Sequence, residues 1–129
     1  MMLLTAALLL MTPASAQTAP ADLPGTSAET KTLFIVSYRP GPKWVAGKPN
    51  SQQALGPHAA YIKRLLDEGV LFAGGPYGDN EGGMAIFWAT DMDRAKAVVA
   101  ADPAVTHGVF VAELRGWTPL FDSKRPLAS

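Results

Sequence analysis

The sequence of 129 residues contains no cysteine. A disulfide framework is therefore excluded, and the thiolate ligands of structural zinc sites are absent. Histidine is scarce as well, because His58 and His107 are the only two, and neither belongs to an H-E-x-x-H motif. These absences predict that the protein holds neither a metal ion nor another cofactor.

Neither sign of charge is in excess, since 11 Lys and Arg residues balance 11 Asp and Glu residues. The basic side chains are dispersed, and the pair Lys63-Arg64 is typical of the solvent-exposed face of a helix. Nothing in this distribution forms the basic patch that a polyanion requires. We therefore predict no nucleic-acid partner.

A long apolar run is found only at the start of the chain. Residues 2–11 are almost wholly apolar, and Ala14-Ser15-Ala16 is a small-residue cleavage motif, although no Lys or Arg precedes the run. The run is shorter than the ~20 residues of an ordinary membrane-spanning helix. We expect a signal peptide over residues 1–16, cleaved after Ala16, and a periplasmic or secreted protein without stable membrane insertion. A retained membrane anchor is the alternative.

The remaining chain divides into a tether, one domain and a tail. Residues 17–31 are rich in Pro, Ala, Thr and Ser without an apolar period, which is typical of a flexible tether. The domain is expected over residues 32–121, and residues 122–129 form the C-terminal tail. Without disulfides, a domain of this size must build a sufficient core by itself or by oligomerising.

Apolar runs, and the Gly and Pro residues that separate them, predict four strands and two helices in the order βαββαβ. This order is that of the ferredoxin-like split βαβ, an α+β fold with an antiparallel sheet and two helices on one face. The predicted strands cover residues 32–38, 70–73, 84–89 and 109–115. The predicted helices cover residues 51–68, with a possible interruption at Gly56-Pro57, and residues 92–101.

The second face of such a sheet is left uncovered by the helices. Two copies that pack sheet against sheet would bury it, so we expect a homodimer. The apolar side chains expected on the uncovered face are Phe34, Val36, Ile86, Trp88, Phe110 and Ala112.

Roughly residues 33–119 resemble the YciI-like (YCII-related) family of the dimeric α+β barrel superfamily. No single motif is specific, and the resemblance rests on the order and spacing of several. These are His58 with Tyr61-Ile62 and Leu65, the stop at Gly69, Ala73-Gly74-Gly75-Pro76, Asp102-Pro103, Gly108, and Arg115-Gly116-Trp117.

The resemblance implies a catalytic His-Asp pair, which maps onto His58 and Asp102. The topology gives an independent reason, because the start of the first helix and the start of the fourth strand lie at the same end of the sheet. Such a carboxylate fixes the imidazole tautomer and stabilises the imidazolium after proton transfer, while the helix dipole favours the neutral ring. The alternative is structural, with His58 a satisfied core or interface residue and Asp102 a helix stop.

Four further residues are candidates for substrate binding: Tyr38, Arg39, Trp44 and His107. The first two end the first strand at the same pole, although Tyr38 also suits simple packing. Trp44 lies in residues 40–50, which contain three prolines and two glycines, and it suits either a hydrophobic plug or a lid over a substrate. His107 suits a turn or a charge partner for a helix end.

Two functions remain open on the sequence. The first is an exported YciI-like enzyme that acts on a small molecule through a metal-free His-Asp acid/base pair, as a lyase, an isomerase or a hydrolase. The alternative is a non-catalytic dimeric module that binds a small ligand or serves as an accessory protein.

Overall fold

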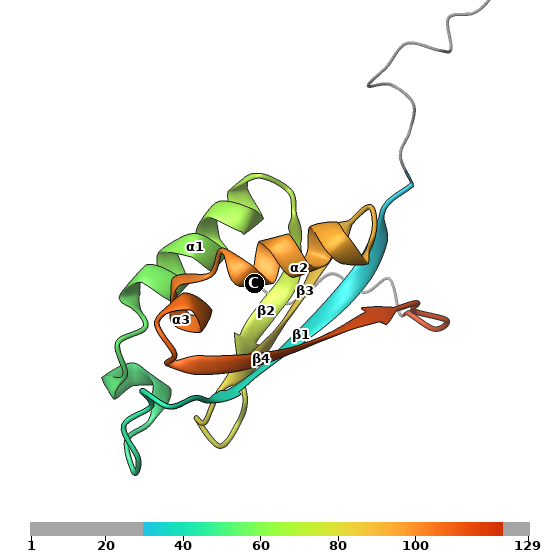
Figure 1. Ribbon diagram of the computed structural model, residues 1–129. Coiled ribbons are helices and arrows are strands. Elements are labelled where there is room, and N and C mark those ends of the chain that lie inside the picture. The colour runs from blue at the N-terminus through green and yellow to red at the C-terminus, as the bar shows by residue number, and fades with distance from the viewer. Residues whose placement is uncertain (1–29, 123–129) are drawn as a thin grey trace, which may run out of the picture.

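The computed structural model describes residues 30–122 (Figure 1). The predicted signal peptide and nearly all of the predicted tether lie outside these residues, so both stay predictions. Within the described part, no helix is both long enough and apolar enough to cross a membrane. The main elements are β1 (Thr32–Pro40), α1 (Gly56–Asp67), β2 (Leu71–Pro76), β3 (Gly83–Ala89), α2 (Met92–Ala100), α3 (Pro103–Thr106) and β4 (Phe110–Trp117), with a short 3-10 helix, η2 (Asn50–Gln52).

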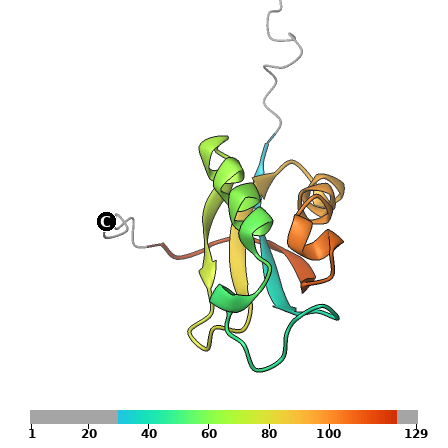
Figure 2. The ribbon, with the colours of Figure 1, turned by 90° about the vertical axis from the view of Figure 1, so that its left-hand side faces the viewer.

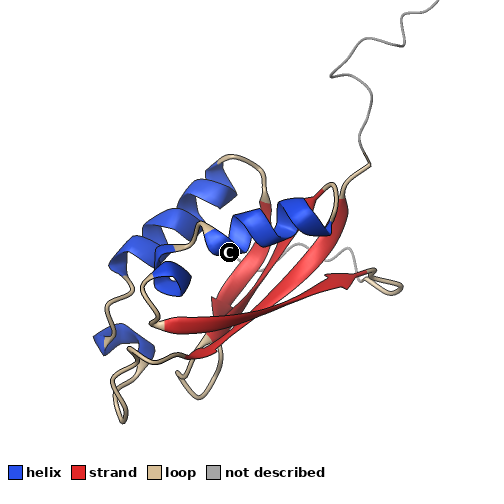
Figure 3. Ribbon diagram, in the orientation of Figure 1, coloured by secondary structure: helices blue, strands red, loops and turns tan. Residues whose placement is uncertain are grey.

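The four strands form one antiparallel sheet in the order β2-β3-β1-β4. The helices α1, α2 and α3 all lie on the same side of this sheet (Figures 1 and 3). Seen from the end, α1 lies over β2 and β3, while α2 and α3 lie toward β4 (Figure 2). The predicted ferredoxin-like α+β fold is therefore confirmed, with α3 as a short addition after α2.

The hydrophobic core lies between the sheet and the helices. It is built from every second residue of the central strands, such as Phe34 and Val36 of β1, which lie beside Phe87 and Ala85 of β3 in register. These positions are buried because strand side chains alternate between the two faces of a sheet. The buried core comprises Phe34, Val36, Tyr38, Ala85, Phe87, Ala89, Ala95, Ala104, Val109 and Phe110.

This register corrects the expected composition of the uncovered face. Phe34, Val36 and Phe110 pack under the helices, and Ala112 packs against the same core, so their expected placement was wrong. The reason is that Leu33-Phe34-Ile35-Val36 is apolar throughout, which hides the alternation that would reveal the inward face.

Helix α1 begins at Gly56 and not near residue 51, as the sequence had suggested. Pro57 stands at the helix start, where its missing N–H costs no hydrogen bond. Asn50 instead joins the loop to the β2-β3 turn: its side-chain amide donates to the carbonyl of Gly82 at 3.0 Å and accepts from the N–H of Gly82 at 3.1 Å. The loop before α1 is thereby attached to the rim of the sheet.

Side-chain amides also hold the preceding loop in one shape. The Gln53 amide accepts from the backbone N–H of Val45 at 2.8 Å and donates to the carbonyls of Val45 and Lys48 at 2.9 and 2.8 Å. Trp44, in the same loop, stacks on Phe110 with ring centroids 5.8 Å apart. These contacts favour the interpretation of Trp44 as a plug on the core.

Candidate active site

His58 is the third residue of α1, at the end of the helix where backbone N–H groups point outward. Its ring lies edge-on to two buried aromatic rings, with centroid distances of 5.2 Å to Tyr38 and 5.4 Å to Phe110. The imidazole is partly buried, with 16% of its side chain exposed. The two rings therefore fix the plane of the imidazole before any ligand arrives.

Asp102 lies between α2 and α3 and is fully buried, at 0% exposure. It caps α3, because its Oδ1 accepts the N–H of Ala104 at 2.9 Å, and Pro103 follows as the first helical residue. The sequence interpretation of Asp102 as a helix stop is therefore correct in structural terms. The same carboxylate is nevertheless aimed at α1.

The two side chains meet across 44 residues of sequence. Nδ1 of His58 lies 2.7 Å from Oδ2 and 2.9 Å from Oδ1 of Asp102. A carboxylate can only accept, so Nδ1 carries a hydrogen and donates it. In the neutral imidazole, Nε2 is then the nitrogen with a free lone pair, and no hydrogen bond engages it within residues 30–122.

Two buried tyrosines lie near this carboxylate. Burial raises the pKa of Tyr38 far above its ordinary value, and the neighbouring carboxylate of Asp102 adds to the effect. The pKa of Tyr61 is also raised, again by burial first and then by the charge of Asp102. Tyr61 uses its hydroxyl to donate to the carbonyl of Val98 at 2.7 Å, which ties α1 to α2.

A cavity of about 680 Å³ opens beside His58, within the usual size range for small-ligand sites. One wall is the side of α1, including Ala59, Ile62 and Leu66, and the base includes Tyr38, His58 and Phe110. The opposite wall is formed by β2, β3 and the turn between them, where four glycines contribute no side chains. These glycines are Gly74, Gly75, Gly82 and Gly83.

The cavity is mainly apolar, and polar groups are confined to a few positions. Lys63 lies on the wall near the surface, and its ammonium is paired with Asp67 at 2.8 Å. Asn50, Ser51 and Asn80 border the side near the loops. A ligand that enters between them would meet apolar walls and, at the base, the imidazole of His58.

Of the four candidates for substrate binding, only Tyr38 lines the cavity, and Arg39, Trp44 and His107 do not. Arg39 is exposed at the end of β1, and His107 is exposed where it ends α3. Trp44 stacks on Phe110 from the loop. Of the six predicted site residues, the structure thus brings together His58, Asp102 and Tyr38, and the binding roles of Arg39, Trp44 and His107 stay predictions.

Two parts of the cavity were missed by sequence reasoning. Phe110 was expected on the opposite face, although it contacts His58. Leu66 lines the cavity although it is 54% exposed. The sequence signal for the cavity was Gly74-Gly75. These glycines lie opposite α1 and contribute no side chains, so the apolar side of the helix is only partly covered.

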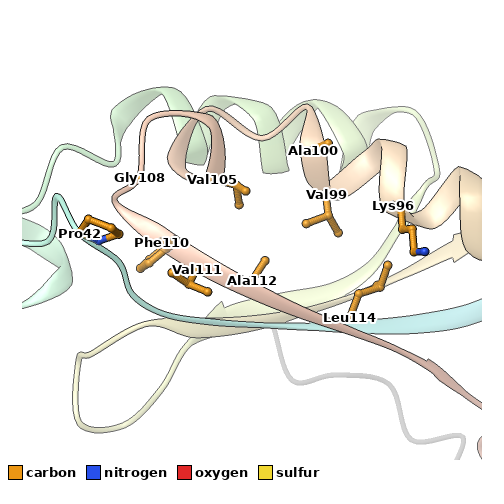
Figure 4. Close-up of a pocket in the computed structure, with 10 residues that line it drawn as sticks. All are labelled: Pro42, Lys96, Val99, Ala100, Val105, Gly108, Phe110, Val111, Ala112 and Leu114. Carbon is orange, nitrogen blue, oxygen red and sulfur yellow. The ribbon is translucent and has the colours of Figure 1, made fainter.

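A second hollow of about 470 Å³ lies between α2, α3 and β4. In Figure 4, Val99 and Val105 point from the helices toward Ala112 and Leu114 of the strand, with Lys96 at one end. Phe110 borders both hollows, but neither His58 nor Asp102 lines this one. The second hollow therefore offers apolar surface without an acid/base group.

Metal ligands do not gather in the described part of the chain: no group of three or more His, Cys, Asp or Glu residues there could hold an ion. The chemistry available at the site is that of an oriented imidazole beside a buried carboxylate. Such a pair can accept and return a proton.

The fold and this site define a small α+β protein in which a histidine, paired with a buried aspartate, lines an apolar, ligand-sized cavity. The chain belongs to the YCII-related family, because the model of the YCII-related domain matches residues 24–118. Comparison with curated proteins gives no significant match.

Among solved structures, one similar chain is a 5-chloro-2-hydroxyhydroquinone dehydrochlorinase from Burkholderia phenoliruptrix AC1100, in complex with 2,5-dihydroxybenzoquinone. The two chains are 24% identical, with a TM-score of 0.52, and the match covers 67% of the present chain and 93% of the other. At this level of identity the likeness supports the α+β fold.

Proposed function

We propose that the protein is an enzyme that acts on a small molecule, with His58 as the acid/base group and Asp102 as its orienting partner. One observation supports this most directly: the His58 ring is held through Nδ1 by a fully buried carboxylate and lines a ligand-sized cavity. A histidine that only stabilised the fold would not need a free ring nitrogen beside such a space.

The proposed step is a proton transfer. Nε2 takes a proton from the ligand, and the freed electron pair forms a double bond within it, either by rearrangement or as a leaving group departs. The proton stays on the imidazole, whose positive charge is stabilised by Asp102, and returns to product or solvent later. This chemistry fits a lyase or an isomerase.

The proposed ligand is a one-ring molecule that carries carbonyl or hydroxyl groups. The apolar walls favour a flat hydrophobic ring, and the imidazole at the base suits a group that can lose a proton. The similar dehydrochlorinase was solved with 2,5-dihydroxybenzoquinone, a ring of this kind. That compound and 5-chloro-2-hydroxyhydroquinone are therefore the first probes to use.

Binding of 2,5-dihydroxybenzoquinone should be blocked by Ala59→Trp, because Ala59 lies on the exposed cavity wall and an indole there fills the opening. We expect affinity to fall at least about tenfold, a loss of roughly 1.4 kcal/mol, in calorimetric titration. Ala60→Trp is the matched control, since Ala60 is an exposed helix residue outside the cavity wall. Equal affinities in the two variants would contradict the assignment of this cavity.

The same protein and probe compounds distinguish the proposed enzyme from the alternative function, a non-catalytic ligand-binding module. It predicts binding in the cavity without chemical change of any bound compound, and unchanged ligand after prolonged incubation with the unmodified protein. The acid/base proposal predicts that His58 is needed for turnover and less so for binding.

We also propose that a second copy of the chain covers the uncovered face of the sheet. Trp88, Met84, Val111 and Trp117 are between 36% and 38% exposed there, and Phe72 lies edge-on to Trp88 at 54% exposure. Apolar side chains in such number on one face are typical of an interface. A face-to-face dimer would bury them in both copies.

Trp88→Glu is expected to convert this dimer to a monomer, because it places a charge within the apolar face that the dimer would bury. We expect the dissociation constant to rise at least about 100-fold in sedimentation experiments, corresponding to about 2.7 kcal/mol. Trp88→Phe keeps an aromatic ring and should remain dimeric. An unmodified protein that sediments as a monomer at all concentrations would refute the proposed dimer.

A further inference from the structure

Asn50 makes three hydrogen bonds to the turn between β2 and β3. Its side-chain amide donates to the carbonyl of Gly82 at 3.0 Å and accepts from the N–H of Gly82 at 3.1 Å. Its backbone N–H donates to the carbonyl of Asn80 at 3.0 Å. Figure 2 shows η2, which begins at Asn50, next to this turn. One residue therefore attaches the loop before α1 to the opposite wall of the cavity.

Gly82 can take part in this link only through its backbone. Its φ is 88°, and a Cβ at this position would collide with the carbonyl oxygen of Tyr38. A side chain at position 82 therefore cannot reach back to the loop. Gly82 is also buried, so its N–H requires the acceptor that Asn50 supplies.

The link lies at the end of the cavity that carries His58. At the other end of α1 the chain itself joins the two walls, because α1 ends at Asp67 and β2 begins at Leu71. Beside His58 the walls are joined through Asn50. Successive backbone hydrogen bonds continue this link into the first turn of α1, from Gln53 to Asn50, from Leu55 to Gln53 and from Ala59 to Leu55.

We propose that Asn50 is a positioning residue that fixes the width of the cavity beside His58, and thereby how large a ring the site accepts. The oxygen and the nitrogen of its side chain are both engaged by Gly82, so it acts through the cavity walls and not by contact with the ligand. The meaning for ligand choice rests on the proposed function. The link between the two walls does not depend on it.

Asn50→Ala tests the proposal, because it removes both side-chain hydrogen bonds to Gly82. Calorimetric titration with 2,5-dihydroxybenzoquinone and with the two-ring compound 2-hydroxy-1,4-naphthoquinone gives one affinity ratio for each protein. A wider cavity holds the small ring less tightly and accommodates the larger one more easily. We therefore expect the ratio to shift by at least about fivefold toward the two-ring compound. A loss of overall stability alone would weaken both ligands alike and leave the ratio unchanged.

Gln53→Ala is the matched control. Its side-chain amide makes three hydrogen bonds within the same loop, to Val45 and Lys48, and it does not line the cavity. The variant loses these three bonds and keeps the link from Asn50 to Gly82. It should therefore leave the affinity ratio unchanged.

A second measurement needs no ligand. NMR relaxation dispersion of the backbone amides should show new exchange in Asn50→Ala at residues 80–83 of the turn and at residues 55–59 of α1, and none there in Gln53→Ala. An unchanged affinity ratio, or unchanged relaxation at these two segments, would overturn the proposal. If neither compound binds, or if neither is turned over, only the proposed function is overturned, because the relaxation result still decides the role of Asn50.

Discussion

His58→Gln is expected to lower turnover by about 10² to 10⁴-fold, which is the usual contribution of a positioned acid/base group to the rate. Glutamine is polar and can donate to Asp102, so the buried carboxylate keeps a partner. It cannot accept a proton at neutral pH. The measurement is chloride release from 5-chloro-2-hydroxyhydroquinone, compared with calorimetric binding of 2,5-dihydroxybenzoquinone to the same variant.

The comparison of turnover with binding separates chemistry from recognition. We expect ligand affinity to change only a few-fold, because the apolar walls of the cavity are untouched. Arg94→Gln is the matched control, since this side chain is exposed on α2 and outside both hollows. Full turnover in His58→Gln would refute the acid/base role.

Asp102→Ala should damage both the fold and the reaction, because one carboxylate serves both. It removes the cap of α3 and the partner of His58, and it leaves the N–H of Ala104 buried without an acceptor. Loss of the cap and of a charged hydrogen bond together predict a decrease of about 2 to 4 kcal/mol in the free energy of unfolding. Denaturant titration measures this decrease.

Asp102→Asn separates the two roles. Asparagine caps helices about as well as aspartate, so we expect most of the stability to be retained. The amide has no charge to stabilise an imidazolium and can reverse the imidazole tautomer, so turnover should still fall by about 10² to 10⁴-fold. Equal losses of stability in the alanine and asparagine variants would contradict the capping argument.

The order of strands and helices was predictable, because apolar runs and the Gly and Pro residues between them reflect local structure. The residues at which the helices and strands begin and end were less predictable. Gly74-Gly75-Pro76 has the composition of a turn, yet it continues β2, because pairing with β3 from Gly83 to Ala85 outweighs local propensity. Likewise, α1 starts only at Gly56, since Asn50 is engaged by Gly82.

The candidate site was predictable only in part. Topology and family resemblance placed His58 and Asp102 at one pole, and the structure brings them within hydrogen-bonding distance. The cavity was missed, because its sequence signal, Gly74-Gly75, has the composition of a turn and only the structure places these glycines in β2 on the cavity wall. The contact of Phe110 with His58 was also hidden, since the inward face of an apolar strand depends on register.

The glycine-lined wall has a further consequence for how this protein can change over evolution. His58 lies on α1 and Asp102 at the junction of α2 and α3, whereas the opposite wall of the cavity is formed by β2, β3 and the turn between them. A Cβ added at Gly74 would lie 3.4 Å from the Cβ of Ala85, which also lines the cavity. In the proposed enzyme, changes in the β2-β3 segment would alter the size of the ligand space without changing His58 or Asp102.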